Sequence, residues 1–208
     1  MSSSILARIG TSRVRMAHFF WRHTIEDGDT VIDATCGRGK DCLELARLVQ
    51  KNGSEKSGFV IGFDIQKAAI NETWTRLSEN KIDMSKVRLF HEGHENIWER
   101  SQREKDVFNN VKLVSFNLGY LPGGNKDIQT KVDTTLMAVE GSSKLLVPGG
   151  VISIVQYPHE EGANEAKALR EWYNSLPPQD WMVTNMMEGE GQPSIVFLIR
   201  RLQNPAPL

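Results

Sequence analysis

The residues from Thr30 to Asp41, TVIDATCGRGKD, decide the fold of this chain. They begin as a short apolar run that ends in Asp33 and continue as a turn that carries Gly37 and Gly39. Residues 42–49 then repeat apolar side chains at helical spacing. This order of strand, glycine-rich turn and helix is typical of the opening unit of a doubly wound α/β fold. Glycine at these two positions also lets a ligand lie against the main chain.

The charges around this turn indicate which kind of ligand it holds. The next apolar run, residues 58–64, ends in Asp64, an acid that can accept hydrogen bonds from both ribose hydroxyls of an adenosine. A dinucleotide site would need a third glycine where Cys42 stands, and no Gly-Lys-Ser/Thr loop for phosphate follows. Asp33 and Asp41 flank the turn and repel phosphate, but they suit a ligand with an ammonium and a sulfonium group. S-adenosylmethionine is such a ligand, and DATCGRG resembles the first motif of the class I methyltransferases.

The amino-acid composition further limits the class of protein and the partners that it can have. The 208 residues fit one domain, and 39% hydrophobic and 25% charged residues are typical of globular proteins. The net charge of −1 argues against a protein coated in basic surface, so any contact with nucleic acid must be local. Cys36 and Cys42 have no second Cys/His pair at ligand spacing, so we expect neither a metal nor a disulfide framework. No apolar run approaches the roughly 20 residues that span a bilayer. We therefore expect a soluble intracellular protein without a membrane partner.

The first 25 residues form a basic extension ahead of a domain that we place at residues 26–208. Four arginines in it are unopposed, since the first acid comes at residue 26; they are Arg8, Arg13, Arg15 and Arg22. Residues at helical spacing predict a helix with one apolar face: Val14, Ala17, His18 and Trp21. Three interpretations stay open, namely a lid helix with solvated arginines, a tRNA-facing arm, and the remnant of a targeting segment. The last would place the protein in a plastid or mitochondrion instead of the cytoplasm.

The rest of the chain alternates predicted helices and strands. We expect helices over residues 65–80, 130–147 and 163–176, and strands over 87–91, 111–117, 151–155, 181–187 and 195–199. Five βα units followed by a closing strand pair predict a Rossmann-like α/β fold. Its sheet has seven strands, mostly parallel with the last strand antiparallel, and helices on both faces. In the helix at 65–80, the expected buried face holds Ala68, Ala69, Trp74 and Leu77.

A second polar motif, NLGYLPGGNK at residues 117–126, follows the fourth strand. In a doubly wound sheet, ligands bind beyond the carboxyl ends of the central strands. Asn117 and Tyr120 therefore place an amide and an aromatic ring at the expected site. The motif is similar to the Asp/Asn-Pro-Pro-Tyr motif of methyltransferases that act on exocyclic amines. This similarity implies that Asn117 and the Leu118 carbonyl accept the amine hydrogens, while Tyr120 stacks on a base or faces the developing positive charge.

Five blocks of the sequence together resemble the small family labelled "rRNA methylase-like"; in order they are DATCGRGKD, FDIQ, HEGH, FNLGYLPGGNK and HEEG. Bacterial members of this family methylate the aminomethyl nitrogen of 5-aminomethyl-2-thiouridine at the tRNA wobble position. The resemblance covers residues 26–201 and implies an S-adenosylmethionine-dependent N-methyltransferase with a tRNA substrate. The chain departs from the family pattern at Cys36, at Cys42, at Asn125 and in the run at 156–158. Asn125 and that run lie on the expected substrate side.

The motifs and the resemblance assign three sets of residues. The expected catalytic residues are Asn117, Tyr120 and His159, where His159 or a water takes the proton of the amine. The expected cofactor-binding residues are Asp33, Ala34, Thr35, Gly37, Gly39, Asp41, Asp64, Ile65, Gln66, His94, Asn117 and Leu118. The expected substrate-binding residues are Tyr120, Leu121, Pro122, Gly123, Lys126, Tyr157, Arg13 and Arg15.

Other classes of function stay open. One is an S-adenosylmethionine-dependent methyltransferase of another RNA or of a small-molecule amine, and another is a cofactor-binding module without activity. The complete set of Asp33, both glycines, Asp64 and residues 117–122 speaks against lost chemistry. A small-molecule enzyme would usually need an added lid domain, for which only the first 25 residues are available. The sequence is compatible with a homodimer and does not fix the oligomeric state.

Overall fold

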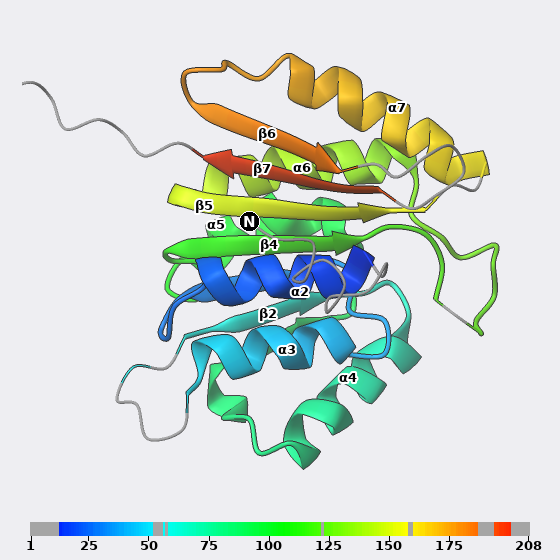
Figure 1. Ribbon diagram of the computed structural model, residues 1–208. Coiled ribbons are helices and arrows are strands. Elements are labelled where there is room, and N and C mark those ends of the chain that lie inside the picture. Colours follow the sequence, from blue (N-terminus) through cyan, green and yellow to red (C-terminus); the bar gives the residue numbers. More distant parts are fainter. Residues whose placement is uncertain are drawn as a thin grey trace, which may run out of the picture.

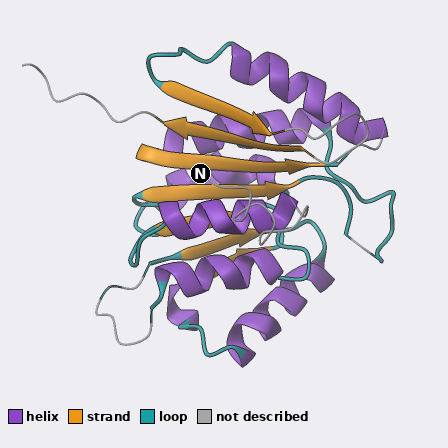
Figure 2. Ribbon diagram, viewed as in Figure 1, coloured by secondary structure: helices purple, strands orange, loops and turns teal. Residues whose placement is uncertain are grey.

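The computed structural model describes residues 13–51, 56, 58–121, 123–157, 160–186 and 194–200. A single sheet lies between layers of helices (Figure 1), and strands and helices alternate along most of the chain (Figure 2). The helices are α2 (Arg13–Thr24), α3 (Lys40–Val49), α4 (Lys67–Glu79), α5 (Ile97–Arg103), α6 (Val132–Leu145) and α7 (Glu160–Asn174), with 3-10 turns η1 (Met84–Lys86) and η2 (His94–Asn96). The strands are β1 (Thr30–Asp33), β2 (Val60–Phe63), β3 (Val87–Phe90), β4 (Val111–Asn117), β5 (Leu146–Gln156), β6 (Trp181–Met186) and β7 (Ser194–Arg200). None of the described helices is both long and apolar enough to cross a membrane.

The strand order brings the two predicted motifs together. It runs β3-β2-β1-β4-β5-β7-β6 in a seven-stranded sheet. β1 to β5 pair in parallel, whereas β7 is antiparallel to both β5 and β6. The prediction of a mostly parallel sheet with an antiparallel closing strand is therefore confirmed. The order reverses between β1 and β4, whose carboxyl ends carry Asp33 and Asn117. At such a reversal the connections leave in opposite directions, which opens a crevice for a ligand.

Successive side chains of each strand point to opposite faces of the sheet and contribute to two hydrophobic layers, one on each face. Val31 and Leu113 lie in one layer, together with apolar residues of α2, α3 and α4. Their neighbours Ile32 and Val114 lie in the other layer, with residues of α5, α6 and α7. Figure 1 shows α2 and α3 in front of the sheet and α5 and α6 behind it. The sheet is buried on both faces, which explains why its central strands read as nearly continuous apolar runs.

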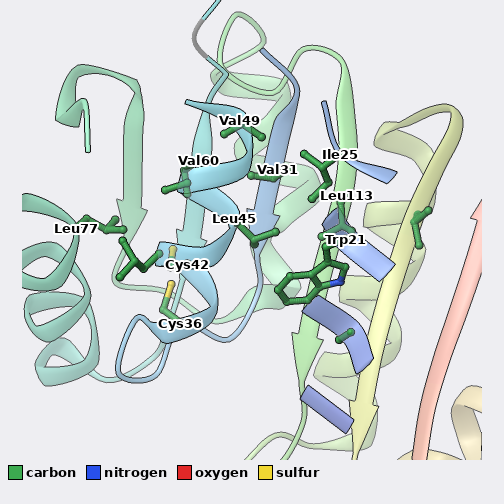
Figure 3. Packing of buried hydrophobic residues seen from close by; sticks show 14 of the residues in the cluster. Trp21, Ile25, Val31, Cys36, Cys42, Leu45, Val49, Val60, Leu77 and Leu113 are labelled. Atoms are coloured by element: carbon green, nitrogen blue, oxygen red, sulfur yellow. The ribbon is translucent and has the colours of Figure 1, made fainter. Parts of the chain in front are cut away.

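Helix α2 belongs to this core. Trp21 is buried beside Leu45 of α3 and Leu113 of β4 (Figure 3). Phe20 stacks on Phe197 of β7, with 4.1 Å between the ring centroids. The predicted boundary at residue 25 therefore falls inside one packing unit of the described chain. Residues 1–12 of the predicted extension lie outside the described residues.

Several element limits differ from their prediction. The Pro-Gly-Gly run at 148–150 separates the predicted helix at 130–147 from the predicted strand at 151–155, but it lies within β5. The register between β4 and β5 shifts at this level, and such a bulge tolerates a proline that cannot donate to the ladder. Helix α7 begins at Glu160 instead of residue 163. The prediction that Ala68 and Trp74 are buried is wrong, because Ala69, Ile70, Thr73 and Leu77 form the inner face of α4.

Candidate active site

The glycine turn after β1 packs closely against α4. Gly39 precedes α3 in a left-handed conformation with a φ of 71°. A Cβ on Gly39 would lie 2.7 Å from the Cα of Thr73, so no larger residue fits without moving the backbone. Gly37 also has a positive φ, and its N–H donates to Oδ2 of Asp64 over 2.8 Å. Glycine is thus needed at position 39, where a side chain would collide with α4.

Asp64 is held in one orientation at the end of β2. Its Oδ2 accepts from Gly37, and its Oδ1 accepts from the N–H of Gln66 over 2.8 Å. Each carboxylate oxygen has a further lone pair, so both can still accept a hydroxyl. Burial raises the pKa of Asp64, and the two amide donors oppose that rise. Ile65 is exposed, and Gln66 occupies the N-cap position of α4 without a capping hydrogen bond from its side chain.

Asp33 is the most buried acid of the turn. Its Oδ1 accepts from the N–H of Thr35 over 3.1 Å, whereas its buried Oδ2 has no hydrogen-bond partner among the described residues. The pKa of Asp33 is raised to about 8, mainly by burial and secondly by the negative charge of Asp41. A buried polar atom without a partner is costly. The arrangement therefore favours a ligand that brings a positive charge or a donor to this carboxylate.

Asn117, at the end of β4, is tied to the glycine turn at two points. Its backbone N–H donates to Oγ1 of Thr35 over 2.8 Å, and its Nδ2 donates to Oδ2 of Asp41 over 3.2 Å. The hydroxyl of Tyr157 is hydrogen-bonded to the same side chain, and burial raises the pKa of Tyr157. Four residues predicted from separate motifs therefore form one polar cluster. Because a carboxylate only accepts, the bond to Asp41 also fixes which end of the amide is the nitrogen.

The loop that follows β4 lies over the glycine turn. A Cβ on Gly37 would be 3.2 Å from Cδ1 of Leu121, and one on Gly123 would be 3.4 Å from Nη2 of Arg38. Tyr120 is 38% exposed, and the ammonium of Lys126 lies 5.6 Å from the centre of its ring. Pro122, also predicted to bind substrate, lies outside the described residues. The residues predicted for the substrate are thus neighbours of those predicted for the cofactor.

A buried acid of α7 anchors this loop. Glu165 is 1% exposed, and its two carboxylate oxygens accept from the hydroxyls of Thr130, over 2.9 Å, and Thr135, over 2.7 Å. Oγ1 of Thr130 in turn accepts from the N–H of Gly119 over 2.9 Å. The two ends of the loop at 119–130 are therefore joined at Thr130, which the carboxylate of Glu165 holds in place. The sequence analysis missed Glu165, since an acid within a predicted helix usually faces solvent.

His94 supports the end of β1. Its ring is buried in η2 and lies edge-on to Phe116, with 5.7 Å between the ring centroids. Nδ1 of His94 lies 3.3 Å from the carbonyl oxygen of Ala34, which can only accept, so Nδ1 carries the proton. Burial lowers the pKa of His94. Leu118 is buried as well and donates its N–H to Val155. The predicted contact of His94 with an adenine ring stays a prediction.

The structure separates the two arginines that were predicted to bind substrate. Arg15 is exposed, but Arg13 is buried and donates to Sδ of Met16 over 3.1 Å. The side chain of Arg13 folds back onto its own helix. His159, predicted to be catalytic, lies outside the described residues. The predictions for Arg13, Arg15 and His159 stay predictions.

His18 of α2 is a site residue that the sequence analysis did not assign. Its Nε2 lies 2.7 Å from Oδ1 of Asp41, so α2 reaches the glycine turn. The signal was present in the sequence, since a polar side chain on the apolar face of a helix needs a partner. What the sequence could not supply was the identity of that partner.

Cys36 and Cys42 are buried free thiols on the turn and on the first turn of α3. Figure 3 shows their sulfur atoms pointing toward each other. The pKa of Cys36 is raised well above its usual value, mainly by burial and secondly by the hydrogen bond with Cys42. Together with Asp33 the thiols bring three atoms that could hold a metal ion within 4.8 Å of one another. The expectation that the protein holds no metal stays a prediction.

The strand order and the acid-flanked glycine turn define a class I methyltransferase, the group of enzymes that take a methyl group from S-adenosylmethionine. Two solved structures share the fold. The "putative rRNA-methylase" from Clostridium thermocellum matches with a TM-score of 0.80 at 33% identity, over 92% of this chain and 98% of that chain. A "putative methyltransferase" from Streptococcus mutans in complex with SAH matches with a TM-score of 0.76 at 26% identity, over 92% of this chain and 99% of that chain.

The chain belongs to the family described as "Putative rRNA methylase", whose model matches residues 60–200. A relative from Arabidopsis thaliana is named "tRNA (mnm(5)s(2)U34)-methyltransferase, chloroplastic". It is 39% identical over 191 residues, which are 89% of this chain and 68% of the relative. The resemblance inferred from the five sequence blocks is thereby confirmed.

Proposed function

We propose that this protein is an S-adenosylmethionine-dependent N-methyltransferase that acts on the aminomethyl group of a modified wobble uridine in tRNA. The reaction would be of the nm5s2U to mnm5s2U type. One observation carries the proposal: Asn117 of the amine-type motif is bonded to Thr35 and Asp41 of the glycine turn. The name of the Arabidopsis relative supports the choice of substrate, and its "chloroplastic" label supports an organellar location.

The residues of the turn fit S-adenosylmethionine. Asp33 has a buried oxygen without a partner and Asp41 adds negative charge, which suits the ammonium and sulfonium groups of the cofactor. Asp64 has lone pairs left for the ribose hydroxyls. Gly37 and Gly39 have positive φ, a conformation in which the main chain of the turn can lie against the cofactor. When bound, the cofactor supplies a methyl group that the sulfonium charge activates.

The chain's own part in the reaction is to hold the amine. Nδ2 of Asn117 is engaged with Asp41, so its Oδ1 accepts a hydrogen of the amine, as does the carbonyl of Leu118. Positioning of this kind lowers a barrier by several kcal/mol, up to roughly 7–11 in well-oriented systems. An aliphatic amine is mostly protonated in water, and the half-buried surroundings of Asn117 favour its neutral form. His159 or a water accepts the released proton, and the exposed ring of Tyr120 stacks on the uracil.

The test is mass analysis of nucleosides from tRNA that carries nm5s2U, after incubation with the protein and the methyl donor. We expect conversion to mnm5s2U. Asn117→Ala should lower turnover by about 100-fold or more, because it removes the acceptor of the amine, while the dissociation constant of the donor stays the same. A methyl group on a base carbon or a ribose oxygen would reject the amine assignment. Transfer to small amines but not to tRNA would favour the small-molecule class instead.

A further inference from the structure

Helix α2 contributes one polar side chain to the cluster around Asn117. His18 lies on the inner side of α2, where its side chain is 18% exposed and its ring centroid is 4.8 Å from that of Trp21. Its Nε2 is 2.7 Å from Oδ1 of Asp41, whose side chain is 15% exposed. The contact is therefore a short, largely enclosed hydrogen bond between α2 and the first turn of α3.

The carboxylate of Asp41 is occupied at both oxygens. Oδ1 faces His18, and Oδ2 accepts from Nδ2 of Asn117 over 3.2 Å. A carboxylate can only accept, so His18 and the amide nitrogen of Asn117 must both donate to it. Removing the first donor frees Asp41 to rotate toward water, and its hold on Asn117 then weakens. Groups linked in this way act as one unit, and their energies are not additive.

We propose that His18 is a positioning residue of the methyl-transfer reaction. Through Asp41 it holds the amide of Asn117 with Oδ1 turned toward the amine of the substrate and Nδ2 turned away from it. The inference rests on the proposed function, because it assigns the residue that sets up the acceptor used there. His18 does not touch the reacting atoms.

Two substitutions separate positioning from packing. His18→Leu keeps an apolar body beside Trp21 but removes the donor, whereas His18→Gln retains a side-chain N–H of similar reach. We expect His18→Leu to lower kcat on tRNA by about 10- to 100-fold, with the donor dissociation constant changed by less than about twofold, and His18→Gln to retain most of kcat. The matched control is His23→Leu, because His23 is exposed on the same helix, where its Nδ1 bonds to the carbonyl of Phe19 and its ring packs on the ring of Phe19, away from Asp41. Normal kcat in His18→Leu, or equal losses in the Leu and Gln variants, would overturn the proposal.

A double variant tests whether His18 acts through Asn117. If it does, adding His18→Leu to Asn117→Ala should cost no further activity, because the amide that His18 positions is already gone. Losses that multiply would show that His18 acts by another route and would also overturn the proposal.

A second readout does not depend on the substrate. In 15N-labelled protein saturated with S-adenosylhomocysteine, the side-chain NH2 signals of Asn117 are assigned by their absence from Asn117→Ala. We expect these signals to shift in His18→Leu and to stay in place in His18→Gln and His23→Leu. Unchanged signals in His18→Leu reject the positioning role, whatever the activity. If the wild-type protein transfers no methyl group to tRNA, the proposed function fails, and this measurement still decides the role of His18.

Discussion

At the scale of single residues, the two acids at the ends of β1 and β2 have opposite surroundings. Asp64 has an amide donor on each oxygen, so its charge is satisfied before any ligand arrives. Asp33 accepts from the N–H of Thr35, and the backbone of Cys42 also lowers its pKa, but its buried Oδ2 has no hydrogen bond of ordinary length among the described residues. Asp64 is therefore ready to accept hydroxyls, whereas the ionisation of Asp33 must depend on what binds beside it.

The raised pKa of Asp33 predicts that donor binding depends on pH. Below its pKa of about 8, Asp33 is mostly protonated in the free protein, and a cationic ligand ionises it. The affinity for S-adenosylmethionine should therefore rise with pH up to about 8, with release of a proton. Calorimetry in two buffers of different ionisation enthalpy measures that release. Asp33→Asn should bind with little pH dependence, and an unchanged slope in this variant would contradict the assignment.

The same shift has a consequence for stability. A carboxyl whose pKa is higher in the folded than in the unfolded chain binds more protons when folded. The contribution of Asp33 to the free energy of unfolding should therefore decline as pH rises from about 3.8 to about 8. Asp33→Asn should remove this part of the decline, which denaturant unfolding of the ligand-free protein at several pH values can measure.

Asp64 gives a simpler prediction. Asp64→Ala removes the acceptor of the ribose hydroxyls and should weaken donor binding by about 1.5–3 kcal/mol, the range for hydrogen bonds to a charged group. Calorimetric titration with S-adenosylhomocysteine measures the change. Undiminished affinity would remove the ribose assignment.

At the scale of elements, the loop at 119–130 depends on Thr130, which bonds to both Gly119 and Glu165. Thr130→Val keeps the shape of the side chain but leaves these two groups unpaired. We expect the KM for tRNA to rise several-fold while the donor affinity stays unchanged. Thr135→Val is the matched control, since Thr135 bonds to the other oxygen of Glu165 from within α6. It should lower the melting temperature without raising KM, and equal KM values in the two variants would refute the loop's role.

The elements also show what the sequence could and could not predict. Strands such as β1 and β4 were predictable because burial on both faces makes them continuous apolar runs. That Asp33, Asp64 and Asn117 lie near one another was also predictable, because each stands at the carboxyl end of a parallel strand, and these ends lie on the same side of the sheet. The partners of His18 and Glu165 could not be predicted, because each contact joins segments that are far apart in the chain. The burial of Arg13 could not be predicted either, because the charge of a side chain does not show which surface covers it.

At the scale of the whole molecule, a net charge of −1 requires that tRNA meets a local group of cations. We expect Arg15 and Lys126 to be two of them. Replacing both with Ala should weaken tRNA binding and reduce the slope of log K against log salt concentration by roughly 2 at most. The control is the double variant Lys51→Ala with Lys105→Ala, which removes the same amount of charge from exposed residues. These two lysines precede β2 and β4 and so lie toward the amino ends of the strands, away from the candidate site. The same slope in both double variants would exclude a local contact.

The stacking of Phe20 on Phe197 joins nearly the first and the last described residues of the chain. On the ribosome, α2 leaves the exit tunnel long before β7, since synthesis proceeds from the N-terminus. The part of α2 that carries Phe20 must therefore wait, exposed or held by a chaperone, until β7 has been synthesised, whereas Trp21 can pack earlier against Leu45 and Leu113. His18 lies on this same helix beside Asp41. A nascent or truncated chain without β7 should therefore have its glycine turn, but the helix that brings His18 to it would lack one of its packing partners.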